Sequence, residues 1–258
     1  MKISIAGTGH VANALGDAFK KAGFEILWIY GRNLTKAASL AGRTGSRVLK
    51  NPSDAAKNKP DIIIIAVKDD AITTVSKMFK TAGTLVVHTS GSIAMSALSS
   101  DHKNCGVFYP LQTFSNVSRV DMKKTPVCVE AGSDSDLKKL LKAASAISGT
   151  VYVTESEVRR EIHLAAVFAN NFSNHMFYIA SEILKKQHLP FELLRPLILS
   201  TVNNAFKSDP SAAQTGPAKR GDAKVMKKQM SMLKKHPDWQ EIYEVISKGI
   251  LKAGHFEK

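Results

Sequence analysis

Short apolar runs alternate with amphipathic stretches over the first 150 residues of the chain. Val11, Leu15 and Phe19 form the apolar stripe of a helix that we expect to end at Gly23. Such alternation of buried strands and helices predicts an α/β domain with a doubly wound, mostly parallel sheet. The predicted strands are 2–6, 25–30, 47–49, 61–67, 84–88, 106–109, 126–130 and 150–154, and a helix is predicted at 134–148.

The pattern changes after residue 154. Neither glycine nor proline occurs from Val151 to Leu189, which allows a helix of about 30 residues. Prolines then divide the remaining chain into shorter helical stretches, of which 224–235 has the apolar side typical of a core-facing helix. We therefore predict two domains, an α/β domain over 1–154 and an all-helical domain over 155–258.

A glycine-rich loop lies between the first strand and the first helix. Its sequence, GTGHVA, is the pattern G-x-G-x-x-A of a Rossmann dinucleotide-binding site in the required strand-turn-helix context. The glycines permit a tight turn and the close approach of a pyrophosphate, and the helix N-terminus offers free N–H groups. The residues predicted to bind the dinucleotide here are Gly7, Thr8, Gly9, His10 and Val11.

The end of the second strand distinguishes NAD from NADP. An acidic residue there binds the ribose of NAD, whereas this chain has Arg32, Asn33 and Lys36. An arginine can hold a 2′-phosphate through two hydrogen bonds, and a hydrogen bond to a charged group contributes about 1.5–3 kcal/mol. The sequence therefore predicts NADP as the cofactor. The alternative is that Arg32 is a surface residue without a ligand.

The carboxyl ends of later strands supply further candidate contacts, because ligands of such sheets bind at that edge. Val67 and Lys68 follow the strand at 61–67 and are predicted to lie beside the cofactor. Ser90 and Gly91 follow the next strand and are candidates for contact with the substrate or with the nicotinamide of the cofactor. A plain turn with capping serines explains this pair equally well.

Candidate acid–base and substrate-binding groups follow. Tyr109 can donate a proton to a carbonyl or imine, and Gln112 and Thr113 in the same segment can orient a polar substrate. His163 and Asn170, seven residues apart in the predicted long helix, share a face, and Asn171 is adjacent. This spacing fits a catalytic histidine with substrate-binding amides, and it also fits a buried histidine capped by an amide.

Arg220 lies in an irregular polar segment between two predicted helices. One interpretation is that it binds a substrate carboxylate or a cofactor phosphate. The other is an interdomain salt bridge, with Asp222 as the N-cap of the next helix. The sequence does not separate these two interpretations.

The net charge of +14 raises the question of nucleic-acid binding. No run of like charge exceeds two residues, whereas basic arms need blocks of about five or more, so we expect a solvated surface and no nucleic-acid partner. The longest apolar run, 62–67, is far below the roughly 20 residues of a membrane span, and the first apolar stretch is too short for a signal peptide. The two cysteines have no metal-ligand or disulfide spacing, so we expect no metal and a cytoplasmic location.

Seven segments together resemble a known family. They are GTGHVA, YGRN, DIIIIAVKDDAI, HTSGS, YPLQTFS, HLAAVFANNF and TGPAKRGD. They look like the Rossmann-like proteins designated NADP oxidoreductases, the last three segments are specific to that family, and the resemblance covers nearly the whole chain. It implies an NADP-binding domain, a small helical domain of unknown function similar to that of 6-phosphogluconate dehydrogenase, and an active site between them. A more distant similarity to pyrroline-5-carboxylate reductases and β-hydroxyacid dehydrogenases implies a homodimer through the helical domain.

The chain departs from these families at two positions. Members of the first family usually have histidine before Pro110, where this chain has Tyr109. The β-hydroxyacid dehydrogenases have a catalytic lysine four residues before the asparagine that matches Asn171, where this chain has Val167. Their mechanism therefore does not transfer whole, and His163, one turn earlier, is the nearest candidate proton donor.

Two functions are compatible with these observations. The first is a reductase in which NADPH delivers a hydride to a small carbonyl or imine and His163 or Tyr109 supplies the proton. The second is a redox-inactive NADP-binding sensor or interaction protein, which the missing lysine favours.

Overall fold

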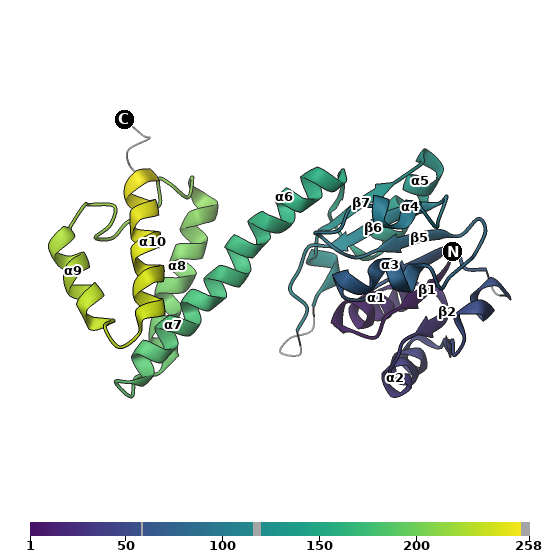
Figure 1. The fold of residues 1–258 in the computed structure, drawn as a ribbon, viewed down its shortest axis with the longest axis horizontal. Helices are drawn as coiled ribbons and strands as arrows, with labels where there is room; N and C mark the ends of the chain where they lie inside the picture. The colour runs from purple at the N-terminus through teal and green to yellow at the C-terminus, as the bar shows by residue number, and fades with distance from the viewer. Residues whose placement is uncertain (58, 116–119, 254–258) are drawn as a thin grey trace. The chain divides into compact units, whose positions relative to one another are not determined.

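The computed structural model describes residues 1–57, 59–115 and 120–253 (Figure 1). It consists of two compact units, Met1–Ala169 and Asn170–Lys258. The first unit runs past residue 154, the boundary predicted from sequence, because Arg159 and Ile162 of the following helix pack against residues of the sheet. The division between the units therefore falls inside the long helix and not in a loop.

The described residues of the first unit form an eight-stranded sheet in the order β3-β2-β1-β4-β5-β6-β7-β8. Adjacent strands are parallel except for β6 and β7, which pair antiparallel. Each predicted apolar run contains a strand, so the mostly parallel sheet is confirmed. The strands are β1 (Lys2–Ala6), β2 (Glu25–Tyr30), β3 (Arg47–Val48), β4 (Ile62–Ile65), β5 (Leu85–His88), β6 (Cys105–Pro110), β7 (Val127–Ala131) and β8 (Val151–Val153).

Helices cover both faces of the sheet, as a doubly wound fold requires. Helices α1, α2 and α5 contribute to the core on one face, and α3 and α4 to the core on the other. Gly23, which follows α1, has the left-handed φ of +82° that a helix stop favours, as the sequence predicts. The helices of this unit are α1 (His10–Lys21), α2 (Leu34–Thr44), α3 (Ile72–Ser76), α4 (Ser96–Ser99), α5 (Asp134–Ile147) and α6 (Ser156–Ala166).

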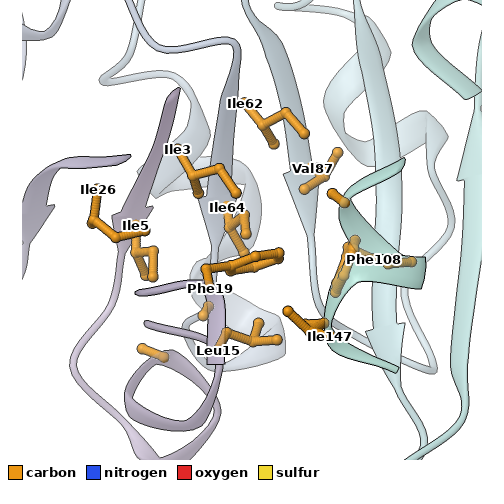
Figure 2. Packing of buried hydrophobic residues seen from close by; sticks show 14 of the residues in the cluster. Ile3, Ile5, Leu15, Phe19, Ile26, Ile62, Ile64, Val87, Phe108 and Ile147 are labelled. Atoms are coloured by element: carbon orange, nitrogen blue, oxygen red, sulfur yellow. The ribbon is translucent and has the colours of Figure 1, made fainter. Parts of the chain in front are cut away.

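The central strand β4 connects the two cores. Ile62 and Ile64 point into the larger core, where Phe19 of α1 packs on Phe108 of β6 with ring centroids 5.7 Å apart (Figure 2). The alternate residues, Ile63 and Ile65, belong to the core on the opposite face. An uninterrupted apolar strand of this kind is typical of a parallel sheet that is buried on both faces.

The second unit is helical in its described residues, which confirms the predicted change of fold after the sheet (Figure 1). Within residues 170–253, only Ala218 and Trp239 are buried. An apolar cavity of about 380 Å³ lies within this unit and is lined by residues that include Ile242 and Tyr243. The helices are α7 (Ser173–Lys185), α8 (Arg195–Lys207), α9 (Ala223–Met232) and α10 (Pro237–Ala253).

The long helix predicted from the absence of glycine and proline is present. It begins with α6, continues through a π-helical segment at Val167–Phe172, and ends with α7 at Lys185. The π-helical segment begins between His163 and Asn170, so these two residues are not seven positions apart in an unbroken α-helix.

No helix among the described residues is long and apolar enough to cross a bilayer. Nor do they contain a cluster of three or more histidine, cysteine, aspartate or glutamate side chains that could hold a metal ion.

Candidate active site

The glycine loop has the tight geometry that a dinucleotide-binding turn requires. Gly7 has a φ of +138°, and a Cβ atom on it would lie 2.0 Å from the carbonyl oxygen of Ala66, so a side chain is excluded. Its N–H donates to Tyr30 O at 2.8 Å, which joins the loop to the end of β2. A Cβ on Gly9 would meet nothing within 4 Å, which leaves open space at the start of α1.

This open space is suited to an anion. Gly9 is the N-cap of α1 and provides no side-chain cap, and the first turn of α1 has no acidic residue. Uncapped N–H groups and the positive end of the helix dipole favour a phosphate at this position. Thr8 is half-buried and His10 is exposed, and the next residue, Val11, packs against the larger core. The loop therefore fits the pyrophosphate of a dinucleotide.

The three residues predicted to bind the 2′-phosphate follow β2, and all of them are exposed: Arg32, Asn33 and Lys36. The Asn33 side chain already caps α2, since its Oδ1 accepts from Lys36 N at 2.9 Å. Gly31 packs closely on Thr8, where a Cβ would lie 2.5 Å from the threonine Cγ2. Arg32 thus directly follows a residue that packs on the glycine loop, and both Arg32 and Lys36 are exposed cations.

The other predicted cofactor contacts lie in the segments that follow the carboxyl ends of β4 and β5. Val67 is half-buried against the second core, and Lys68 is exposed. Ser90 Oγ accepts hydrogen bonds from Ser92 N at 3.0 Å and Ile93 N at 3.1 Å. The Ser90 hydroxyl therefore caps the turn after β5, as one of the two interpretations predicts.

His88, at the end of β5, supports this turn. Its Nδ1 accepts from Ser90 N at 3.2 Å, and its Nε2 faces Ala94 O at 3.4 Å. Burial, helped by the positive charge of Arg159, lowers the pKa of His88 to about 4. The imidazole is therefore neutral near pH 7 and acts as a fixed support for the segment that carries Gly91.

Tyr109 and His163 form the central pair of the candidate site. Tyr109 Oη lies 2.9 Å from His163 Nδ1, and the two rings meet edge to face. Gly91 packs against both, because a Cβ on it would lie 2.7 Å from His163 Cγ and 2.8 Å from Tyr109 Cζ. The three residues come from β6, α6 and the turn after β5, and all lie in the first unit.

Burial raises the pKa of Tyr109 to about 12, while the Arg159 charge opposes that shift. The phenol is therefore protonated near neutral pH. With a neutral His163, it donates to Nδ1; with a protonated His163, Nδ1–H donates to Oη and the phenol proton can point elsewhere. The pair can consequently hold and relay a proton.

The predicted substrate-binding residues are all exposed. Gln112 and Thr113 lie in the exposed segment after β6, where Gln112 Oε1 accepts from Thr113 N at 2.8 Å. Asn170 and Asn171 lie in the exposed π-helical turn and belong to the second unit. Arg220 is exposed in the segment before α9, and the Asp222 carboxylate caps that helix by accepting from Val225 N at 3.1 Å, as one interpretation predicts.

Sequence reasoning missed three residues next to the central pair. They are His88, Glu130 and Arg159, of which Arg159 is fully buried and ion-paired with Glu130. The sequence signal for His88 was its place at the end of an apolar strand. Arg159 gave none, because a charged residue within a charged segment normally indicates a solvated surface. Glu130 was predicted only as the last residue of a strand.

Known proteins resemble this chain over nearly its whole length. A family model described as NADP oxidoreductase, coenzyme F420-dependent, matches residues 2–91, and one described as a domain of unknown function (DUF2520) matches residues 125–250. A solved structure from Bacteroides fragilis, whose name assigns it to the NADP oxidoreductases, is 37% identical, with a TM-score of 0.88, and the match covers 97% of this chain and 98% of that one. The chain belongs to this NADP oxidoreductase family. A search of curated proteins returned no match.

More distant structures share the fold of this oxidoreductase family. A 1-pyrroline-5-carboxylate reductase from Streptococcus pyogenes is 14% identical, with a TM-score of 0.66, and the match covers 98% of both chains. An imine reductase from Myxococcus stipitatus in complex with NAD+ is 15% identical, with a TM-score of 0.63, and the match covers 98% of this chain and 94% of that one. At these identities the likeness shows a common architecture.

Proposed function

We propose that this protein is an NADPH-dependent oxidoreductase that transfers a hydride between NADPH and a small carbonyl or imine substrate. The observation that carries the proposal is the Tyr109–His163 hydrogen bond of 2.9 Å, packed against Gly91 in the turn that follows β5. When bound, NADPH supplies the hydride, and the protein has to position the substrate and provide the proton. Reduction of C=O or C=N needs such a donor at the heteroatom.

The central pair delivers that proton by a relay. Nδ1–H of protonated His163 donates to Tyr109 Oη, while the phenol O–H donates to the substrate nitrogen or oxygen. As the phenol proton passes to the substrate, the imidazolium returns one to Tyr109. Each reduction therefore consumes one proton through His163.

The remaining predicted contacts are proposed in the same roles. The glycine loop with His10 and Val11 holds the pyrophosphate, and Arg32 and Lys36 hold the 2′-phosphate. Other proposed cofactor contacts are Asn33, Val67, Lys68, Ser90 and Gly91. The proposed substrate contacts are Gln112, Thr113, Asn170, Asn171 and Arg220.

We also propose a homodimer through the helical unit. The described part of this unit buries little of its own apolar surface, and Phe206 of α8 is 91% exposed. Leu197 and Leu199 of the same helix are also exposed, as is Val245 of α10. Exposed apolar surface of this extent is typical of an interface.

A substrate panel tests the catalytic proposal. Keto acids, aldehydes and cyclic imines are each mixed with NADPH, and loss of its absorbance is followed. Coenzyme F420 belongs in the panel because the matching N-terminal family carries its name. Turnover should disappear in Tyr109→Phe and His163→Ala and persist in His175→Ala, which removes an exposed histidine from the same long helix. Turnover that survives both site variants contradicts the proposed relay.

The alternative is a redox-inactive NADP-binding sensor, favoured by Val167 at the position of the dehydrogenases' lysine. Tight NADPH binding without turnover of any compound in the panel supports this alternative. Absent binding of NADPH contradicts both functions.

A further inference from the structure

An ion pair between a fully buried arginine and a partly buried glutamate lies on the sheet face that carries Tyr109. Glu130 of β7 is opposite Val107 of β6, and Tyr109 is opposite Cys128, so these four side chains share one face of the antiparallel pair. Arg159 of α6, four residues before His163, has a fully buried side chain and donates from Nη1 to Glu130 Oε2. Neither Arg159 nor Glu130 is among the proposed nucleotide or substrate contacts.

This ion pair is the centre of a larger hydrogen-bonded cluster, which we call the Arg159 cluster: Arg159, Glu130, Ser156, and the backbone of Ile93 and Met95. Arg159 Nη2 donates to Ile93 O and to Ser156 Oγ, the latter at 3.2 Å. Ser156 Oγ also lies 2.9 Å from each Glu130 carboxylate oxygen and accepts from Met95 N at 3.0 Å. The cluster thus joins β7, the first turn of α6 and the segment after β5.

Two of these three elements, α6 and the segment after β5, contribute to the candidate site. Gly91 lies two residues before Ile93, and His163 lies one helical turn after Arg159. We propose that Arg159, held by Glu130, is a positioning residue that fixes α6 against the segment after β5 and keeps His163 Nδ1 in hydrogen-bond contact with Tyr109 Oη. Only the catalytic consequence of this proposal rests on the proposed function.

Electrostatics supports the same role. A buried charge is costly unless it is paired, so conformations of α6 that separate Arg159 from Glu130 are disfavoured. The Arg159 charge also lowers the pKa of Tyr109 against the opposing effect of burial. Arg159 therefore makes the phenol a better proton donor while it holds the partner imidazole in place.

The positioning effect can be measured without a substrate. In protein labelled with 15N at histidine, the His163 Nδ1 resonance reports whether this nitrogen accepts a hydrogen bond, and Tyr109→Phe supplies the reference for its loss. At a pH where His163 is neutral, we expect Arg159→Met to move the Nδ1 resonance to the Tyr109→Phe position. Because the measurement needs neither NADPH nor turnover, it stands even if the reductase proposal fails.

A double variant separates positioning from stability. Arg159→Met alone leaves the Glu130 carboxylate buried without its partner and should lower the unfolding midpoint, whereas Glu130→Gln with Arg159→Met removes both charges and should restore it. We expect the double variant to show the same shifted Nδ1 resonance as Arg159→Met although its stability is recovered. In Arg159→Lys, which retains a positive charge, we expect the Nδ1 resonance to lie closer to its wild-type position. A wild-type Nδ1 resonance in the double variant would overturn the proposal.

Turnover provides a second measurement if the panel yields a substrate. In the double variant we expect kcat to fall by about tenfold or more, because a small misplacement of a proton donor is costly. The dissociation constant for NADPH should change less than kcat, because the glycine loop, Arg32 and Lys36, which are proposed to hold the phosphates, lie outside the Arg159 cluster. An unchanged kcat would overturn the catalytic part of the proposal.

Discussion

A Cβ atom on Gly91 would lie 2.7 Å from Nδ1 of His163, closer than side-chain carbons approach other atoms in folded proteins. A side chain at position 91 is therefore excluded by close packing against neighbouring side chains, and a left-handed φ is not the reason for the glycine. We predict that Gly91→Ala lowers the free energy of unfolding by about 1–3 kcal/mol, the usual cost of overpacking, and weakens the Tyr109–His163 contact. Chemical denaturation measures the first effect.

Gly42 provides the matched control for this substitution. It lies exposed in α2, and a Cβ on it would meet nothing within 4 Å. Gly42→Ala should raise the free energy of unfolding by about 0.5–1 kcal/mol, because alanine is the better helix former. Equal stability changes in Gly91→Ala and Gly42→Ala contradict the packing argument.

The cofactor preference is assigned to Arg32. We predict that Arg32→Asp weakens NADPH binding by about ten- to hundredfold, because a charge-assisted hydrogen bond to the 2′-phosphate is replaced by repulsion. The affinity for NADH, which lacks that phosphate, should change far less. Fluorescence titration with both cofactors measures the difference.

Lys103→Asp is the control for long-range charge effects. Lys103 is exposed before the amino end of β6, whereas dinucleotides bind at the carboxyl ends of the strands. The same change of charge should there weaken NADPH binding only slightly. If Arg32→Asp weakens the binding of NADPH and NADH equally, the assignment of the cofactor preference to Arg32 is contradicted.

Which features could be predicted from sequence depends on how local their signals are. The strands and the glycine loop follow from neighbouring residues, such as the unbroken isoleucines of β4. Tyr109 and His163 could each be proposed as a proton donor, but their hydrogen bond joins residues 54 positions apart and depends on how α6 lies on the sheet. The ion pair of Arg159 and Glu130 depends on the same packing.

His88 makes stability depend on pH. Its pKa is lowered from 6.5 in the unfolded chain to about 4 in the folded protein, so between these values only the unfolded chain binds the proton. The contribution of neutral His88 is complete above pH 6.5 and is lost as the pH falls toward 4. We predict a loss of about 3 kcal/mol from this group.

Other groups titrate in the same range, so the variant His88→Gln is the reference. Chemical denaturation of wild type and variant at a series of pH values gives the difference in their free energies of unfolding. This difference should shrink from about pH 7 to about pH 4 as the wild type loses its advantage. A difference that stays constant with pH would show that His88 does not titrate as described.

The proposed homodimer can be tested through the two tryptophans, one in each unit: Trp28 of β2 and Trp239 of α10. Trp28→Phe leaves fluorescence from the helical unit, and Trp239→Phe leaves fluorescence from the sheet unit. Because association stabilises the folded state by mass action, we predict that the unfolding midpoint reported by Trp239 rises with protein concentration. The midpoint reported by Trp28 should rise less, since the proposed interface lies outside its unit. A Trp239 midpoint that is independent of concentration, together with sedimentation of a 28.0 kDa species alone, would contradict the dimer.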